Sequence, residues 1–180
     1  MKIFPKIIRS ALPLTAAALL SACIEINSSG YSDLSETEKQ HVRACTVPLD
    51  SVTNDGNLYK VTVGQVRDYI RRNKEVIVYE WLPFCSGSNG RPPMEVKRAC
   101  DRRHIPLVVI SSVYDGVFPI PATNAFPLFV IDNAAYNTDN YQTYGEAFYK
   151  ALTGSDSEER QVNSFHYFHD GRYVRSFEGV

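Results

Sequence analysis

The chain has 180 residues, with 19 Lys and Arg against 20 Asp and Glu, and 44% of its residues are hydrophobic and 12% aromatic. This is enough apolar material for one ordinary folded domain, and the composition excludes a collagen, a coiled coil and a disordered chain. The net charge is −1 and like charges form no long block, so the basic surface that nucleic-acid binding usually needs is missing. We therefore expect no nucleic-acid partner.

The first 22 residues have the pattern of a secretory signal peptide. Lys2, Lys6 and Arg9 occur without any acidic residue and precede an apolar run over residues 11–20, which is too short for a permanent membrane span. Residues 20–23 then read Leu-Ser-Ala-Cys, which resembles the lipobox of bacterial lipoproteins. In that family the chain is cut before the cysteine, so the resemblance implies removal of residues 1–22 and lipidation of Cys23. A secreted protein cut at a small residue is the alternative.

Lipidation of Cys23 would attach the chain to a membrane by its acyl chains. Removal of residues 1–22 leaves 16 Lys and Arg against 20 acidic residues, a net charge of about −4, so electrostatic attraction to lipid is not expected. Residue 24 is Ile, whereas Asp there retains lipoproteins of enteric-type bacteria in the inner membrane. The resemblance thus implies the outer membrane, facing the periplasm. Residues 23–37 are polar and Ser-rich and are expected to form a flexible tether, in which Leu34 alone is suited to packing.

The domain expected over residues 38–180 alternates strands and helices. Residues 61–73 carry the apolar spacing of an amphipathic helix capped by Thr62, and residues 75–82 form a near-continuous apolar run typical of a doubly buried strand. The same criteria predict a helix at 94–103, strands at 105–113 and 126–132, a helix at 141–152 closed by Gly154, a charged and solvated loop at 155–160, and a hairpin of 165–169 and 172–177 around Asp170-Gly171. This order predicts an α/β fold with a mixed sheet flanked by helices.

Around residue 85 the sequence resembles the thioredoxin-like family. That family has an aromatic residue four before and another directly before its first active-site Cys, a Pro eight after it, and a cis-Pro about forty residues later. Here the matching residues are Trp81, Phe84, Cys85, Pro93 and Pro127. The resemblance implies a thioredoxin-like mixed sheet. It also implies that about thirty residues, which hold an extra helix, are inserted between the strand after Pro127 and the C-terminal hairpin.

The same resemblance implies the functional residues. Cys85 would be the nucleophile, with its thiolate favoured by a helix N-terminus, and the groove beside it would be formed by Trp81, Phe84, Ser88, Phe126 and Pro127. Two departures affect the chemistry. Ser88 stands where the family has its second Cys, so dithiol exchange at this motif is impossible, and Tyr79 stands where many members hold a buried carboxylate.

Three cysteines besides Cys23 allow three pairings, each leaving one thiol over. A disulfide between Cys45 and Cys100 is preferred because it leaves Cys85 reactive. A pair of Cys85 with Cys100 would have to span about 18 Å if a helix separated them, which exceeds disulfide reach. A pair of Cys45 with Cys85 stays open, with Cys45 as a mobile resolving thiol.

Two functions remain open. The first is a thiol-disulfide oxidoreductase that acts through the single nucleophile Cys85 on periplasmic protein thiols. The second is a non-catalytic binding or assembly lipoprotein that holds a protein partner in the groove. No cofactor is expected, and no metal site, because His166 and His169 would point to opposite faces of a strand. Phosphate-binding loops and hydrolase motifs are absent from the sequence.

Overall fold

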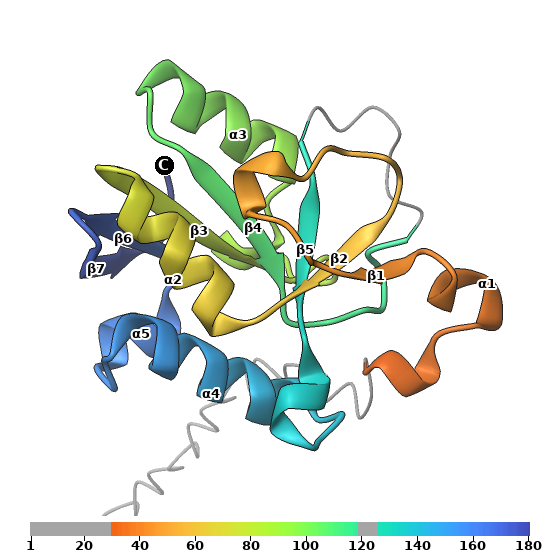
Figure 1. Cartoon of the computed structure of the whole chain (residues 1–180). Coiled ribbons are helices and arrows are strands. Elements are labelled where there is room, and N and C mark those ends of the chain that lie inside the picture. The colour runs from red at the N-terminus through yellow and green to blue at the C-terminus, as the bar shows by residue number, and fades with distance from the viewer. Residues whose placement is uncertain (1–29, 119–125) are drawn as a thin grey trace, which may run out of the picture.

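A computed structural model of the chain describes residues 30–118 and 126–180 (Figure 1). The expected signal peptide, the expected lipidation site Cys23 and residues 24–29 of the expected tether therefore lie outside the described residues. Within the described ranges, no helix combines the length and the apolarity that a bilayer span requires.

A seven-stranded sheet forms the centre of the described part, in the order β1-β2-β5-β4-β3-β6-β7. The first five strands in that order are parallel, and β6 and β7 follow as an antiparallel hairpin beside β3. The strands are β1 (Val42–Ala44), β2 (Leu58–Val61), β3 (Glu75–Trp81), β4 (Leu107–Ser111), β5 (Leu128–Ile131), β6 (Phe165–His169) and β7 (Arg172–Phe177). The predicted α/β class with a mixed sheet flanked by helices is confirmed.

Helices cover both faces of this sheet. The α-helices are α1 (Glu36–Lys39), α2 (Val63–Arg72), α3 (Pro93–Arg102), α4 (Tyr141–Thr153) and α5 (Glu158–Val162). Short 3-10 helices lie at Tyr31–Asp33, Leu49–Ser51, Ser88–Gly90 and Asn133–Tyr136. The buried residues of α2 and α4 belong to one hydrophobic cluster and those of α3 to another, so α3 lies on the opposite side of the sheet from α2 and α4 (Figure 1).

The central strand β3 contributes to both clusters. Val76 and Val78 point into the cluster with α2 and α4, whereas Ile77 and Tyr79 point into the cluster with α3. Because successive side chains of a strand alternate between faces, a strand buried on both sides must be apolar at every position. Residues 76–79 meet this condition and are all buried, whereas Glu75, Glu80 and Trp81 are only partly buried, so the prediction of a doubly buried strand is confirmed at the centre of the run.

The predicted helix ends are confirmed at α2 and α4. The Thr62 side chain accepts a hydrogen bond from the backbone N–H of Gln65, and the Gln65 side chain in turn accepts from the N–H of Thr62, a complete capping box. At the end of α4, Gly154 adopts the left-handed conformation at φ 69° and its N–H donates to the carbonyl of Lys150. A side chain there would be strained, so Gly154 is the residue that ends the helix.

The predicted hairpin is also confirmed. Asp170 and Gly171 form its turn with φ of 48° and 75°, which is the positive φ that a tight turn requires at both central positions.

Two expectations about chain segments are wrong. The last part of the expected tether is folded: Leu34 is buried, as its side chain suggested, and the ring of Tyr31 meets that of Tyr114 at 5.7 Å between centroids. The folded part therefore includes residues 30–37. The expected solvated loop at 155–160 contains the start of α5, and Arg160 is only 4% exposed. The strand predicted at 126–132 is β5, and it lies in parallel between β2 and β4.

Candidate functional site

Cys85 lies in the loop that follows the carboxyl end of β3. Its backbone N–H donates to the carbonyl of Leu82 at 3.1 Å, which turns the chain back directly after the strand, and the residue is partly exposed. The N–H of Leu82 donates to the carbonyl of Asn89 at 2.7 Å, so the two ends of the loop are joined. The loop thus presents Cys85 at the carboxyl edge of the sheet.

Three further contacts hold this loop. The buried Tyr79 hydroxyl lies 3.1 Å from the carbonyl oxygen of Ser88 and 3.0 Å from that of Arg91, and its burial raises the pKa of Tyr79. The Ser88 hydroxyl lies 3.1 Å from the hydroxyl of Ser164. A Cβ added at Gly90 would come within 1.6 Å of the Cys85 carbonyl oxygen, so only glycine fits there. Tyr79 therefore acts as a structural support of the loop.

The expected helix N-terminus at Cys85 is wrong. The helix α3 begins at Pro93, eight residues later, with Pro92 as the residue before it. Between them lies only the three-residue 3-10 helix at Ser88–Gly90. Cys85 is therefore not a residue of the first turn of α3, where the helix dipole acts. A proline is well suited to the first helical position, and two in succession fixed the start of α3 at that point.

The groove expected between Cys85 and Pro127 is also wrong. In the sheet, Phe129 of β5 pairs with Ile110 of β4, and Ile110 pairs with Glu80 of β3. Pro127, two residues before Phe129, therefore lies opposite Val78, which is three residues before Trp81. Two strand spacings and three residues along a strand separate Pro127 from Trp81 by about 14 Å, and Cys85 lies beyond Trp81.

The parallel direction of β5 explains this separation. Pro127 precedes β5 and Cys85 follows β3, so the two residues lie at opposite ends of the sheet. Phe126 and Pro127 instead line a separate cavity of about 170 Å³ with Leu49 and Tyr69. The residue that precedes the antiparallel neighbour of β3 is Ser164, whose carbonyl accepts a hydrogen bond from the N–H of Glu80 at 2.8 Å.

The preferred disulfide between Cys45 and Cys100 is wrong. Cys45 belongs to the hydrophobic cluster of α2 and α4, and Cys100 belongs to the cluster of α3, so the sheet separates them. Both are buried free thiols. Burial raises the pKa of Cys45, and it raises the pKa of Cys100 to about 11. Neither forms a thiolate readily at neutral pH, because the low-dielectric interior disfavours the charged form.

The aromatic residues near Cys85 do lie together with it. Phe84 is 40% exposed, and its ring meets that of Tyr141, at the start of α4, edge to face at 6.2 Å between centroids. Trp81 is partly buried against the cluster of α3. The expected set of Trp81, Phe84, Cys85 and Ser88 is therefore gathered at one edge of the sheet, without Phe126 and Pro127.

A polar cavity that the sequence interpretation missed opens on the α4 side of β3. It has a volume of about 210 Å³, and its charged, amide and phenolic lining consists mainly of Glu80, Tyr141, Glu146, Tyr149, Arg160 and Gln161. The Ser112 hydroxyl donates to Glu80 at 2.9 Å. Burial raises the pKa of Glu80 to about 7, with the Glu146 charge acting in the same direction and Ser112 and Arg160 opposing it.

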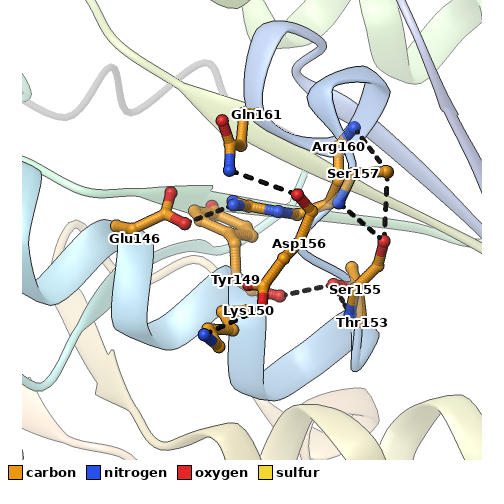
Figure 2. Close-up of polar contacts among 9 residues, drawn as sticks. All are labelled: Glu146, Tyr149, Lys150, Thr153, Ser155, Asp156, Ser157, Arg160 and Gln161. Atoms are coloured by element: carbon orange, nitrogen blue, oxygen red, sulfur yellow. Dashed lines mark hydrogen bonds and ion pairs between the residues drawn. The ribbon is translucent and has the colours of Figure 1, made fainter.

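Arg160 is the cation of this cavity. Its side chain is 3% exposed and reaches from α5 to Glu146 on α4, with which it forms an ion pair (Figure 2). The Nε atom of Arg160 is buried and has no hydrogen-bond partner among the described residues. A buried charge is costly without partners, so the ion pair with Glu146 is what holds the guanidinium here.

His166 is buried behind Arg160 and Tyr149. Its Nδ1 is 2.8 Å from the Ser176 hydroxyl, while its Nε2 has no partner among the described residues. Its ring lies 4.9 Å from that of Tyr149 between centroids. Burial and the Arg160 charge lower the pKa of His166 to about 3, so the imidazole is neutral at ordinary pH. The described residues contain no group of three or more His, Cys, Asp or Glu placed to hold a metal ion.

One signal in the sequence pointed to this cavity. Glu80 is a carboxylate inside an otherwise apolar strand, and buried carboxylates are rare unless paired or functional. Glu146 and Arg160 carried no such signal, because they come from surface-type segments. No family model, curated protein or solved structure matches this chain.

Proposed function

We propose that the chain is a lipid-anchored protein of the bacterial cell envelope whose thioredoxin-like domain exchanges disulfides through Cys85. The observation that carries the proposal is the contrast among the three cysteines of the described residues. Cys45 and Cys100 are buried with raised pKa values, whereas Cys85 is partly exposed in a loop at the carboxyl edge of the sheet. Ligand and reactive groups commonly gather at this edge in open α/β sheets.

The domain assignment is supported by the relation of β3 to its neighbours. A thiol-bearing loop follows β3, α3 leads to the parallel strand β4, and an antiparallel hairpin borders β3 on its other side. The spacing of Trp81, Phe84, Cys85 and Pro93 agrees with the family pattern. In the family, the cis-Pro precedes the antiparallel neighbour of the active-site strand. Under this assignment Ser164 takes that position beside the Cys85 loop, and β5 is an additional strand.

The chemistry requires thiols from other molecules. The Cys85 thiolate attacks one sulfur of a partner's disulfide, a new S–S bond forms as the old one breaks, and the released thiolate takes a proton from water. A low-molecular-weight thiol then displaces the reduced partner, and a second such thiol releases Cys85 as a small disulfide forms. Ser88 cannot replace these thiols, and Cys45 and Cys100 are buried.

The lipid anchor rests on the lipobox resemblance at residues 20–23. Cells that express the full chain with labelled palmitate should incorporate the label into the protein, and the Cys23→Ala variant should lose it. The protein should sediment with the outer membrane, because residue 24 is not Asp. Label-free protein in the soluble periplasmic fraction would contradict the anchor and leave the domain's chemistry to be tested separately.

A non-catalytic binding protein is the second candidate, and the position of α3 favours it. The helix α3 starts at Pro93, so Cys85 does not stand at the entrance of the helix as the first Cys does in this family. In that case the exposed Phe84 ring and the neighbouring loop would serve as a docking surface for a protein partner.

The rate of Cys85 alkylation as a function of pH distinguishes the two. An apparent pKa well below the ordinary value of about 8.5, together with mixed disulfides trapped in cells, supports exchange chemistry. The Cys85→Ser variant should trap nothing. An apparent pKa at or above the ordinary value, with no trapped partner, would refute the exchange proposal in favour of binding.

A further inference from the structure

The polar cavity between β3, α4 and α5 has no role in disulfide exchange. It contains two carboxylates, Glu80 and Glu146, and one guanidinium, Arg160, within a volume of about 210 Å³. Glu80 comes from β3, whereas Glu146 and Arg160 come from the consecutive helices α4 and α5, so the fold gathers the three groups. The helices α4 and α5 approach each other through the Glu146–Arg160 ion pair (Figure 2).

The charged groups of the cavity are incompletely satisfied by the protein. Arg160 lines the cavity with a side chain that is 3% exposed, and its Nε is buried without a partner in the described residues. Glu80 receives one side-chain hydrogen bond, from Ser112 at 2.9 Å, although a carboxylate has about four acceptor positions. Unpartnered buried donors are uncommon in folded proteins and call for a bound molecule or water.

The helix α4 packs closely against the side chain of Ser112 beside the cavity. Gly145 of α4 packs against Ser112 so closely that an added Cβ would come within 3.1 Å of the Ser112 hydroxyl. This contact places α4 over the end of β3, where Ser112 orients Glu80 and where Tyr149, 1% exposed, is packed beneath. Ser112 therefore orients Glu80, and burial restricts Arg160, before any ligand arrives, which lowers the entropic cost of binding.

We propose that this cavity is a binding site for a small zwitterion of the α-amino-acid class. The ligand carboxylate would accept hydrogen bonds from Arg160, and the ligand ammonium would donate to Glu80 and Glu146. A simple anion would meet two carboxylates, and a simple cation would meet the guanidinium, so only a ligand with both charges is complementary throughout. The volume suits a molecule of about five to ten heavy atoms, well below drug size.

The test uses the ¹⁵N-labelled full chain in detergent micelles, titrated with glycine, L-serine, L-glutamine and L-lysine. At least one should cause saturable shifts of the amides of Gly145, Glu146 and Gln161, with a Kd below about 10 mM. The deaminated and decarboxylated analogues, 3-hydroxypropionate and ethanolamine in the case of serine, should bind at least tenfold more weakly. No shift with any of the four, or equal binding of one analogue, overturns the proposal.

Two isosteric variants test the assigned carboxylates. Glu146→Gln retains an acceptor for Arg160 and should weaken binding about tenfold or more through loss of the charge, and Glu80→Gln should act in the same way above pH 7, where Glu80 is ionised. Glu158→Gln removes an equal charge from the exposed face of α5, outside the cavity, and should leave affinity unchanged. Binding that responds equally to all three variants would indicate a general charge effect and contradict the site. Cys85 takes no part in this assay, so a failure to bind amino acids would leave the exchange proposal untouched.

Discussion

The hydroxyls of Ser88 and Ser164 lie 3.1 Å apart, and this contact joins the Cys85 loop to the residue that precedes β6. The carbonyl of Ser164 also accepts a hydrogen bond from the N–H of Glu80, so Ser164 contacts both the end of β3 and the loop after it. The hairpin of β6 and β7 therefore helps to fix the position of Cys85. The loop is further constrained by the close approach of Gly90 to the Cys85 backbone.

Substitution of Gly90 should disturb this loop selectively. A Cβ at Gly90 would overlap the Cys85 carbonyl, and because that atom is backbone, the loop must move. Gly90→Ala should cost about 1–3 kcal/mol in the free energy of unfolding and increase the native alkylation rate of Cys85. Gly87→Ala is the matched control, because its nearest contact is the Asn89 side chain at 3.5 Å. Equal urea midpoints and alkylation rates for the two variants would show that the close approach is unimportant.

The sequence predicted those elements whose signals are local. The apolar spacing and capping residues of α2, the doubly buried run of β3, the glycine that ends α4 and the Asp170-Gly171 turn each act within a few residues. The short strands β1 and β2 escaped prediction because three or four residues carry no periodicity. β1 pairs with β2, and β2 pairs with β5, so both strands depend on non-local interactions.

The candidate site was predicted only in its contiguous part. Trp81, Phe84, Cys85 and Ser88 are neighbours in sequence and stay together, whereas Pro127 was assigned by spacing alone. Spacing cannot distinguish a strand that joins β3 from one that joins β4, and β5 takes the second position. The polar cavity was missed for a related reason, since Glu146 and Arg160 meet only after α4 and α5 have packed.

Glu80 should make the free energy of unfolding fall with rising pH above the pKa that this carboxyl group has in the unfolded chain. Its pKa is about 7 in the folded chain and about 4.5 when unfolded, so the folded state holds an extra proton between these values. The contribution of Glu80 to stability is thus fully present below pH 4.5 and is lost as pH rises to 7. The free energy of unfolding of Glu80→Gln, measured relative to that of the natural chain, should therefore rise by about 2–3 kcal/mol from pH 4.5 to pH 7. Urea unfolding at several pH values measures this, and a constant difference would contradict it.

His166 should act in the opposite sense over an overlapping range. Its pKa is about 3 when folded and about 6.5 when unfolded, so the unfolded state gains a proton first as pH falls. Stability from the neutral imidazole is present above pH 6.5 and is lost towards pH 3, at up to about 1.4 kcal/mol per pH unit. Between pH 4.5 and 6.5 the slopes of Glu80 and His166 oppose each other. His166→Asn should therefore unmask a decline of stability with rising pH there, and a decline no steeper than that of the natural chain would refute it.

The Glu146–Arg160 pair should show strong coupling in a double-mutant cycle. Arg160 is almost fully buried and Glu146 is half exposed, so removal of the carboxylate leaves a buried cation without its partner. Glu146→Ala should cost about 2–3 kcal/mol, more than Arg160→Met, whose apolar side chain leaves no unpaired buried charge. The double variant should resemble Arg160→Met alone. As a control, the exposed pair of Arg71 and Asp68 should show a coupling below about 1 kcal/mol. Equal coupling energies for the two pairs would be inconsistent with the burial of Arg160.

Two glycines in helical segments should respond to alanine with opposite signs. Gly154 ends α4 with φ of 69°, a conformation that costs an alanine about 1–2 kcal/mol although the space around it is open. Gly64 lies in the first turn of α2, where an added Cβ meets only the Thr62 hydroxyl at an ordinary 3.8 Å. Gly154→Ala should therefore lower the urea midpoint, and Gly64→Ala should raise the free energy of unfolding by about 0.5 kcal/mol, because alanine restricts the unfolded chain. If both variants were stabilised, Gly154 would not adopt the left-handed conformation, and α4 would extend towards α5 instead of ending there.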